Sequence, residues 1–258
     1  MLLVIDVGNT NIVLGVFKGD QLTAHWRIRT ERNTTEDEFN VLAAGLFARS
    51  RLEFHEIAKT IISSVVPPMV NILDSFCRKY LGHAPHWIDA RSYPGMPILY
   101  NNPKEVGADR IVNSVAAFQH YRTSLIVIDF GTATTFDVIS ESGEYLGGAI
   151  CPGIGIAAEA LFARASKLPR VEIFKPPTQV VGKDTIASIQ SGIIYGYAAM
   201  VDGMVQRIRA EMKTQCKVIA TGGLAPLIQN VATTIESVEP NLTLEGLKII
   251  ADSLAGSP

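Results

Sequence analysis

The chain has 258 residues, of which 47% are hydrophobic and 19% are charged. It is therefore long enough to bury a sizeable core and to form one large domain or two of ordinary size. Its formal net charge is −2 and its sequence pI is about 6.2, which provides no electrostatic footprint for nucleic acid or an anionic membrane surface. The composition favours a globular protein that binds small molecules or other copies of itself.

Three cysteines, widely spaced and odd in number, argue against a disulfide framework and for a reducing compartment. The chain opens directly on an apolar strand, without a basic lead or a long apolar segment. We therefore expect neither a signal peptide nor a membrane span. Together these features predict a cytoplasmic protein.

The first part of the chain has the hydrophobic patterns of a three-stranded meander, a helix, a strand and a second helix. The pair Gly19 and Asp20 predicts a hairpin turn. Thr35 and Glu38 form a capping box that predicts the start of the first helix. The expected elements are strands at 2–5, 12–17, 22–28 and 60–66, a helix that follows Thr35, a helix at 69–80 and a short strand at 86–88.

A loop rich in proline, glycine and asparagine at 92–103 predicts a boundary between an N-terminal domain, 1–103, and a C-terminal domain, 104–258. A helix that opens near 107–110 leads into the second half, where the order of elements repeats. We expect strands at 125–129, 135–139, 145–150 and 217–220, a helix through 165, one long or two shorter helices over 185–212, and a last helix at about 243–254. The pattern predicts an α/β protein built from two βββαβα halves.

One motif occurs in both halves: an apolar run that ends in a carboxylate, a glycine and small polar side chains. Asp6 and Gly8 in the first copy correspond to Asp129 and Gly131 in the second, with the same separation of 123 residues. The two halves therefore resemble one unit used twice.

Such a motif presents backbone N–H groups and the side chains of Asn9, Thr10 and Asn11 to an anion. Because Asp6 would repel a phosphate group, its expected role is to hold Mg²⁺ against phosphate oxygens. The alternative is an aspartate that only closes its own turn. The second copy favours the phosphate site, because two such hairpins facing one another would grip a polyphosphate from both sides.

Two further turns are candidates for the site. Gly222 and Gly223 follow a strand and would let the backbone approach a nucleotide closely, although an ordinary turn is the alternative. Asp109 and Arg110 open a helix and suit phosphoryl transfer, as orienting base and as substrate or phosphate clamp. The alternative is an aspartate favoured at a helix N-terminus beside a solvated arginine.

The segment 153–158 matches the dinucleotide fingerprint G-x-G-x-x-A, and Glu172 lies near the place of its acidic partner. That fingerprint requires the first strand of a parallel βαβ unit, whereas the preceding strand here closes an antiparallel meander. We therefore expect a tight turn into a helix at 153–158.

Several segments together carry a family resemblance over nearly the whole chain. They are Asp6 to Thr10, Ile62 to Pro67, Tyr100 with Asn102 and Pro103, Gly107 to Arg110, Asp129 to Thr134, Gly148 with Pro152 and Gly153, Leu168 with Pro169, and Thr221 to Leu224. The chain resembles the type III pantothenate kinases, bacterial enzymes that begin coenzyme A synthesis. The resemblance implies the actin-like ATPase fold shared with Hsp70 and sugar kinases, with two duplicated RNase H-like domains facing a nucleotide cleft.

The resemblance also implies ATP-dependent phosphorylation of the 4′-hydroxyl group of pantothenate. ATP with Mg²⁺ would be bound by Asp6, Val7, Gly8, Asn9, Thr10, Asn11, Ile12, Val13 and Thr132. Pantothenate would be held by Tyr100, Gly107, Ala108, Asp109 and Arg110.

Three further roles follow from the resemblance. Asp109 would accept the hydroxyl proton, and Asp129 would ligate a monovalent cation, K⁺ or ammonium. Thr185 would reach pantothenate from the neighbouring subunit of a homodimer whose site lies at the interface. Since a helix N-terminus stabilises negative charge, we expect Asp109 to be ionised at neutral pH and to take the proton late.

Two other functions remain open on the same fold. One is a non-catalytic, nucleotide-dependent regulator, in which ATP sets domain closure; compact loops and the pair Asp109 and Arg110 disfavour it. The other is a phosphohydrolase that activates water in place of a substrate hydroxyl group.

Overall fold

The computed structural model describes residues 1–89, 93, 95–173 and 175–255. Ser92 and Pro94 of the expected boundary loop lie outside the described residues. The chain divides into two compact units, of which the first comprises Met1–Ala116 together with the C-terminal segment from Leu242, and the second comprises Ala117–Asn241. Each unit contains one five-stranded sheet.

The first sheet has the strand order β3-β2-β1-β4-β5. Its strands are β1 (Leu2–Val7), β2 (Asn11–Lys18), β3 (Gln21–Arg29), β4 (Lys59–Ser64) and β5 (His86–Trp87). The predicted meander is confirmed, because β1, β2 and β3 pair antiparallel, and β4 then lies parallel to β1. Gly19 has a φ of 59°, as a tight hairpin turn between β2 and β3 requires.

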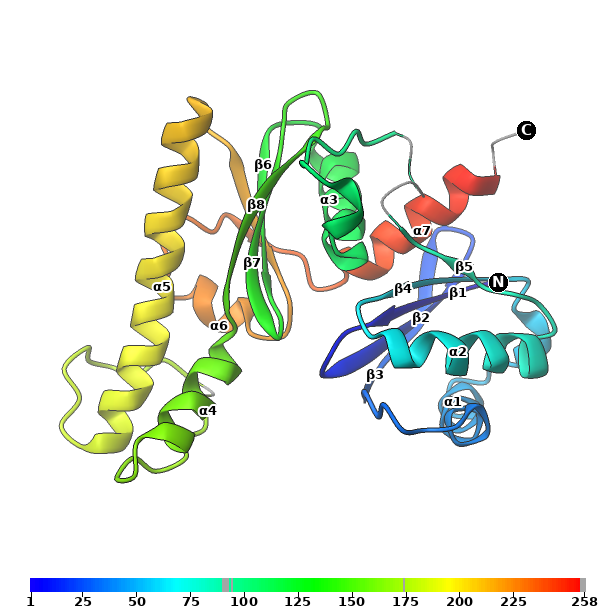
Figure 1. The fold of residues 1–258 in the computed structure, drawn as a ribbon, viewed down its shortest axis with the longest axis horizontal. Coiled ribbons are helices and arrows are strands. Elements are labelled where there is room, and N and C mark those ends of the chain that lie inside the picture. The colour runs from blue at the N-terminus through cyan, green and yellow to red at the C-terminus, as the bar shows by residue number, and fades with distance from the viewer. Residues whose placement is uncertain (90–92, 94, 174, 256–258) are drawn as a thin grey trace. The chain divides into compact units, whose positions relative to one another are not determined.

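Helices cover both faces of this sheet (Figure 1). They are α1 (Glu36–Arg49), α2 (Pro67–Phe76) and α7 (Leu242–Ala255), and α3 (Ala108–Tyr121) contacts α7. Ile5 and Ile62 belong to the core formed with α1 and α2. On the opposite face α7 packs against β1, β2 and β4. The predicted capping box is confirmed at α1, where Glu38 N donates to Thr35 Oγ1 at 3.2 Å and Thr35 N donates to Glu38 Oε2 at 2.8 Å.

Short turns complete the first unit and shift two predicted boundaries. The strand expected to reach residue 66 ends at Ser64, and the helix expected over 69–80 ends at Phe76 and continues as one π-helical turn, Cys77–Leu81. Pro67 and Pro68 lie in the first turn of α2, where a missing N–H costs no hydrogen bond. Single 3₁₀ turns occupy Phe54–Glu56 and Pro103–Glu105.

The second sheet has the order β10-β9-β6-β7-β8. Its strands are β6 (Leu125–Phe130), β7 (Ala133–Ile139), β8 (Tyr145–Pro152), β9 (Lys217–Thr221) and β10 (Ser237–Val238). Three helices cover one face (Figure 1): α4 (Ile154–Arg164), α5 (Thr185–Met212) and α6 (Ala225–Gln229). The segment 185–212 is thus one long helix. Ile126 and Ile128 belong to the core beneath these helices.

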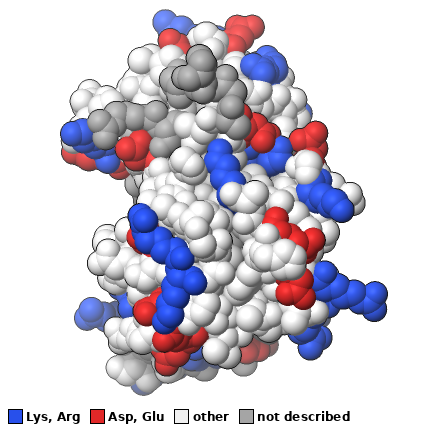
Figure 2. Space-filling view, turned by 90° about the vertical axis from the view of Figure 1, so that its right-hand side faces the viewer, with Lys and Arg blue, Asp and Glu red and all other residues white. Residues whose placement is uncertain are grey.

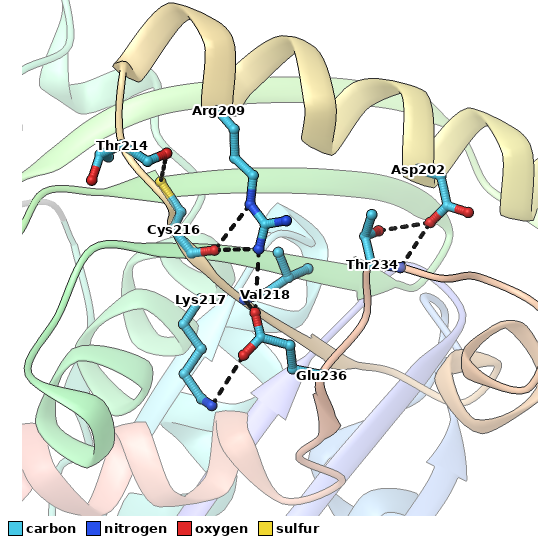
Figure 3. A network of polar contacts seen from close by, with 8 residues as sticks. All are labelled: Asp202, Arg209, Thr214, Cys216, Lys217, Val218, Thr234 and Glu236. Atoms are coloured by element: carbon cyan, nitrogen blue, oxygen red, sulfur yellow. Dashed lines mark hydrogen bonds and ion pairs between the residues drawn. The ribbon is translucent and has the colours of Figure 1, made fainter.

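A polar network ties the C-terminal half of α5 to β9 and β10 (Figure 3). Arg209 donates from Nη2 to Cys216 O at 2.6 Å and forms an ion pair with Glu236 at 3.3 Å. Glu236 also pairs with Lys217 at 3.4 Å. Nearer the middle of the helix, Asp202 Oδ1 accepts from Thr234 Oγ1 at 2.7 Å. These contacts fix the strand that ends at the Gly222 turn.

The last helix groups with the first unit, which differs from the predicted ranges 1–103 and 104–258. A Cβ atom at Gly246 of α7 would lie 2.2 Å from Val112 O of α3, so the two helices touch through backbone. Thr243 Oγ1 also donates to Asn113 Oδ1 at 2.7 Å. These contacts join the opening of α3 to α7, which packs on the first sheet.

The face shown in Figure 2 carries Lys and Arg side chains interspersed with Asp and Glu side chains. Within the described ranges, no helix combines the length and the apolar composition that a bilayer span requires.

Candidate functional site

The first hairpin joins β1 to β2 through residues 8–10. Gly8 N donates to Asn11 O at 3.0 Å and closes the turn. From the end of β3, Thr30 Oγ1 donates to Gly8 O at 2.7 Å, and Arg32 Nη2 donates to Asn9 Oδ1 at 3.0 Å. The turn, with Asn9 and Thr10 exposed, is therefore held by hydrogen bonds from the segment that follows β3.

Asp6 stands near the end of β1 and pairs in register with Ser63 of the parallel strand β4. Ser63 Oγ donates to Asp6 Oδ1 at 2.5 Å, and Ser63 is fully buried. Burial raises the pKa of Asp6 to about 7, against the lowering effect of the Ser63 hydrogen bond, and the charge of Asp109 raises it further. Two carboxyl groups of the first unit are thus close enough to repel one another.

Asp109 lies in the first turn of α3, where its Oδ1 accepts from Arg110 N at 2.8 Å. A Cβ atom at Gly107 would lie 2.5 Å from this same oxygen, so the glycine leaves room for the carboxylate. Burial raises the pKa of Asp109, while the hydrogen bond and the charge of Arg110 lower it. Burial is therefore the largest influence on the pKa of Asp109, and the expectation that this group is ionised at neutral pH stays a prediction.

The other residues expected to hold substrate lie along the approach to α3. Tyr100 is partly buried ahead of the 3₁₀ turn Pro103–Glu105, which Asn102 caps by accepting from Lys104 N at 3.3 Å. Ala108 and Arg110 are buried, with 8% of each residue exposed. The predicted substrate residues thus lie between the partly buried Tyr100 and the buried first turn of α3, which contains Asp109.

The second hairpin repeats the first with one residue fewer. Only Gly131 and Thr132 stand between β6 and β7, and Gly131 N donates to Ala133 O at 3.0 Å. Asp129 pairs in register with Thr221 of β9, as Asp6 pairs with Ser63. Because the turns differ in length, the two copies present different sets of backbone groups.

Two glycines bring backbone against the second hairpin. A Cβ atom at Gly153 would lie 2.1 Å from Thr132 O, and one at Gly222 would lie 2.6 Å from Asp129 Oδ1. Gly222 also has a φ of 93°, which disfavours any side chain. The residues predicted to contact nucleotide and cation in this half are thus brought together, with Gly223 exposed beside them.

The two glycines at 153 and 155, which match the dinucleotide fingerprint, have different surroundings in the structure. A Cβ atom there would meet nothing within 4 Å, whereas Gly153 packs tightly on the hairpin. Gly153 also precedes α4 as its N-cap. The first glycine of the pattern therefore serves packing within the unit.

Thr185 is an exposed residue at the start of α5, which Asp184 caps by accepting from Ala187 N at 2.8 Å. It lines an open groove with Leu161 and Ser188. The structure places it in the second unit, on other elements than the hairpin of Asp129.

The sequence prediction missed two residues of these clusters, Ser63 and Gly153. Ser63 could have been found from register, because it stands beside Asp6 once β1 and β4 are aligned in parallel. The packing of Gly153 on Thr132 depends on the turn geometry of both segments, for which the sequence offers no local signal.

Two sheets of matching order, each with an Asp-x-Gly hairpin after its first strand, define the actin-like ATPase and sugar kinase fold class. The activator of 2-hydroxyisocaproyl-CoA dehydratase from Clostridium difficile has a TM-score of 0.59 at 15% identity, covering 100% of this chain and 98% of that one. An inorganic polyphosphate/ATP-glucomannokinase from Arthrobacter sp. has a TM-score of 0.52 at 16% identity and covers 98% of both chains.

Sequence comparison identifies the family within this fold class. The family described as type III pantothenate kinase matches residues 2–207. The type III pantothenate kinase of Desulfatibacillum aliphaticivorans is 67% identical over 257 residues, covering 100% of both chains. That of Desulforapulum autotrophicum is 65% identical over 253 residues, covering 98% of this chain and 97% of the relative. The chain belongs to the type III pantothenate kinase family.

The packing of Gly153 can be tested against Gly155, two positions along the same turn. We expect Gly153→Ala to lower the free energy of unfolding by about 3 kcal/mol, because its Cβ atom would overlap Thr132 O. Gly155→Ala is expected to be neutral or to stabilise by up to ~1 kcal/mol, since it adds a helix-favouring residue in open space. Urea unfolding measures both, and equal effects would contradict the packing role.

Proposed function

We propose that this chain transfers the γ-phosphoryl group of ATP to the 4′-hydroxyl group of pantothenate, the first step of coenzyme A biosynthesis. Membership of the family and the names of relatives up to 67% identical support this reaction. The observation that carries it is the Asp109 carboxylate, which lies near Asp6 and in the space left by Gly107. An acceptor for the hydroxyl proton thus stands beside a candidate metal ligand.

The residues near Asp6 suit a divalent cation. Its carboxyl group is desolvated and repelled by Asp109, and its pKa is raised to about 7; a cation would relieve both effects. In the proposal Asp6 holds Mg²⁺, which supplies neutralisation of phosphate charge. The adjoining hairpin residues Val7 to Val13, with Thr132, Gly222 and Gly223 of the second unit, bind the nucleotide.

Asp109 is the proposed proton acceptor. Its raised pKa brings it nearer to neutral pH, where a general base combines adequate basicity with adequate ionisation. Arg110, Tyr100, Gly107 and Ala108 hold pantothenate so that its hydroxyl group faces this carboxylate. Little covalent chemistry is required of the protein, because phosphoryl transfer depends mainly on positioning and charge.

Asp129 is proposed to ligate a monovalent cation, K⁺ or ammonium. A Cβ atom at position 222 would lie 2.6 Å from its Oδ1, so only glycine lets the backbone approach this oxygen so closely. The second hairpin is also one residue shorter than the first. These differences support separate roles for Asp6 and Asp129.

We further propose a homodimer in which Thr185 reaches the pantothenate of the neighbouring subunit. The groove that contains Thr185 is also lined by the exposed Leu161, and the second unit exposes further apolar side chains, which mark interaction sites where they are contiguous. The exposed residues are Ile150, Ile156, Leu161, Phe162, Val180, Val181 and Ile186. A cytoplasmic location, without nucleic-acid or membrane partners, follows from the composition and completes the proposal.

The reaction is tested directly by incubating the purified protein with ATP, Mg²⁺, K⁺ and pantothenate. We expect 4′-phosphopantothenate in amounts equal to the ADP formed, measured by mass spectrometry and a coupled ADP assay. Loss of ATP without this product would indicate the phosphohydrolase, and binding of ATP without turnover would indicate the regulator.

Asp109→Asn is expected to lower kcat by about 10²–10⁴-fold, because the amide cannot accept the proton, with pantothenate binding largely kept. Gly107→Ala should also lower kcat, since its Cβ atom would displace Asp109 Oδ1. Steady-state kinetics and pantothenate titration of both variants provide the measurement. Turnover like that of the unaltered protein in Asp109→Asn would contradict the assigned role.

Asp129→Ala is expected to abolish the response of turnover to K⁺ while the protein stays folded. The unaltered protein should be more active in potassium than in sodium buffer, because the carboxylate holds the larger ion. Circular dichroism provides the control for folding. Equal rates of the unaltered protein in the two buffers would contradict a monovalent cation site at Asp129.

A further inference from the structure

Ser63 makes a hydrogen bond that the fold itself does not require. Its hydroxyl group is fully buried and donates to Asp6 Oδ1 at 2.5 Å, a distance typical of O–H donation to a carboxylate. In the described part of the chain, this is the one hydrogen bond recorded for the Asp6 side chain. The bond therefore fixes one carboxylate oxygen and leaves the other to a ligand.

The second half of the chain provides an internal comparison. Thr221 occupies the position beside Asp129 that Ser63 occupies beside Asp6. Its hydroxyl group instead donates to Glu239 O at 2.8 Å. A buried hydroxyl group at this position can thus be satisfied by a backbone carbonyl, so donation to the aspartate is a property of the first half.

The two halves also differ in the residue that comes directly after Thr221 and after Ser63. Gly222 comes after Thr221, and its backbone lies so close to Asp129 that a Cβ atom there would be 2.6 Å from Oδ1. Ser64 comes after Ser63, and its Oγ accepts from Val66 N at 3.1 Å at the entrance to α2. Two hydrogen bonds therefore hold the end of β4: Ser64 Oγ accepts from Val66 N, and Ser63 Oγ donates to Asp6.

We propose that Ser63 is a positioning residue for the divalent cation, which holds Asp6 in the orientation that the metal requires. The proposal rests on the proposed function, in which Asp6 is the metal ligand. Residues that hydrogen-bond to metal ligands orient them, and losing one typically weakens metal affinity by about 10–100-fold. Ser63 would act through Asp6 without touching ATP or pantothenate.

The experiment compares Mn²⁺ binding, measured by electron paramagnetic resonance with ADP present and pantothenate absent. We expect Ser63→Ala to raise the Kd of Mn²⁺ by about tenfold, and to raise the Mg²⁺ concentration for half-maximal turnover similarly. The KM of pantothenate should stay within about twofold. Ser63→Thr keeps the hydroxyl group, and a threonine fits the equivalent position 221, so it should restore most of the affinity.

Thr60→Val is the matched control. Thr60 is fully buried on the same strand, and its hydroxyl group contacts His83 Nε2 at 2.9 Å, away from Asp6. Its loss should leave Mn²⁺ binding unchanged.

If Ser63→Ala does not fold, Ser63→Cys provides a second variant. Cysteine fills the site with a weaker donor and is also expected to weaken Mn²⁺ binding.

Two results would overturn the proposal: Mn²⁺ binding by folded Ser63→Ala within twofold of the unaltered protein, or an equal loss in Thr60→Val, which would indicate a structural effect. Since Mn²⁺ binding is measured without pantothenate, failure of the proposed function appears separately, as absence of 4′-phosphopantothenate in the turnover assay.

Discussion

Both units depend on a carboxylate placed at the end of the central strand of a sheet. Strands β1 and β6 have a neighbour on each side, and Leu3 to Ile5 and Leu125 to Ile128 are fully buried. A carboxylate there is drawn toward the core, where desolvation of its charged form is costly. Burial accordingly raises the pKa of Asp6 to about 7. The ionised form of such a carboxylate is stabilised only when a cation or hydrogen-bond donors lie beside it.

The two copies meet this demand by different means. In the first, Ser63 donates to Asp6 from the adjoining strand. In the second, the equivalent Thr221 donates to Glu239 O, and the backbone of Gly222 packs closely against the carboxylate. Since the sheets share their strand order and pairing, this divergence does not follow from the fold. The surroundings of the two carboxylates are therefore set by the residues at the ends of β4 and β9 in each half.

The local elements could be predicted from sequence because their signals are local. The capping box of Thr35 and Glu38, the turn at Gly19 and the repeated Asp-x-Gly hairpin each depend on neighbouring residues, and the structure contains all three. The place of α7 could not be predicted. Its apolar stripe indicates that one face is buried, but either sheet could cover it, and only the structure shows that α7 packs on β1, β2 and β4.

The same limit applies to the chemistry of the site. The positions of Asp6, Asp109 and Asp129 were evident from motifs, whereas their surroundings come from segments distant in the chain. Asp109 illustrates this, because a helix N-terminus stabilises a carboxylate by only about 0.3–1 kcal/mol, and burial of a charge costs several kcal/mol. Burial is therefore the larger effect, and the pKa of Asp109 rises despite the hydrogen bond from Arg110 N. The helix start alone would predict a lowered pKa, so the direction of the shift could not be derived from the segment that contains Asp109 and depends on the residues that bury it.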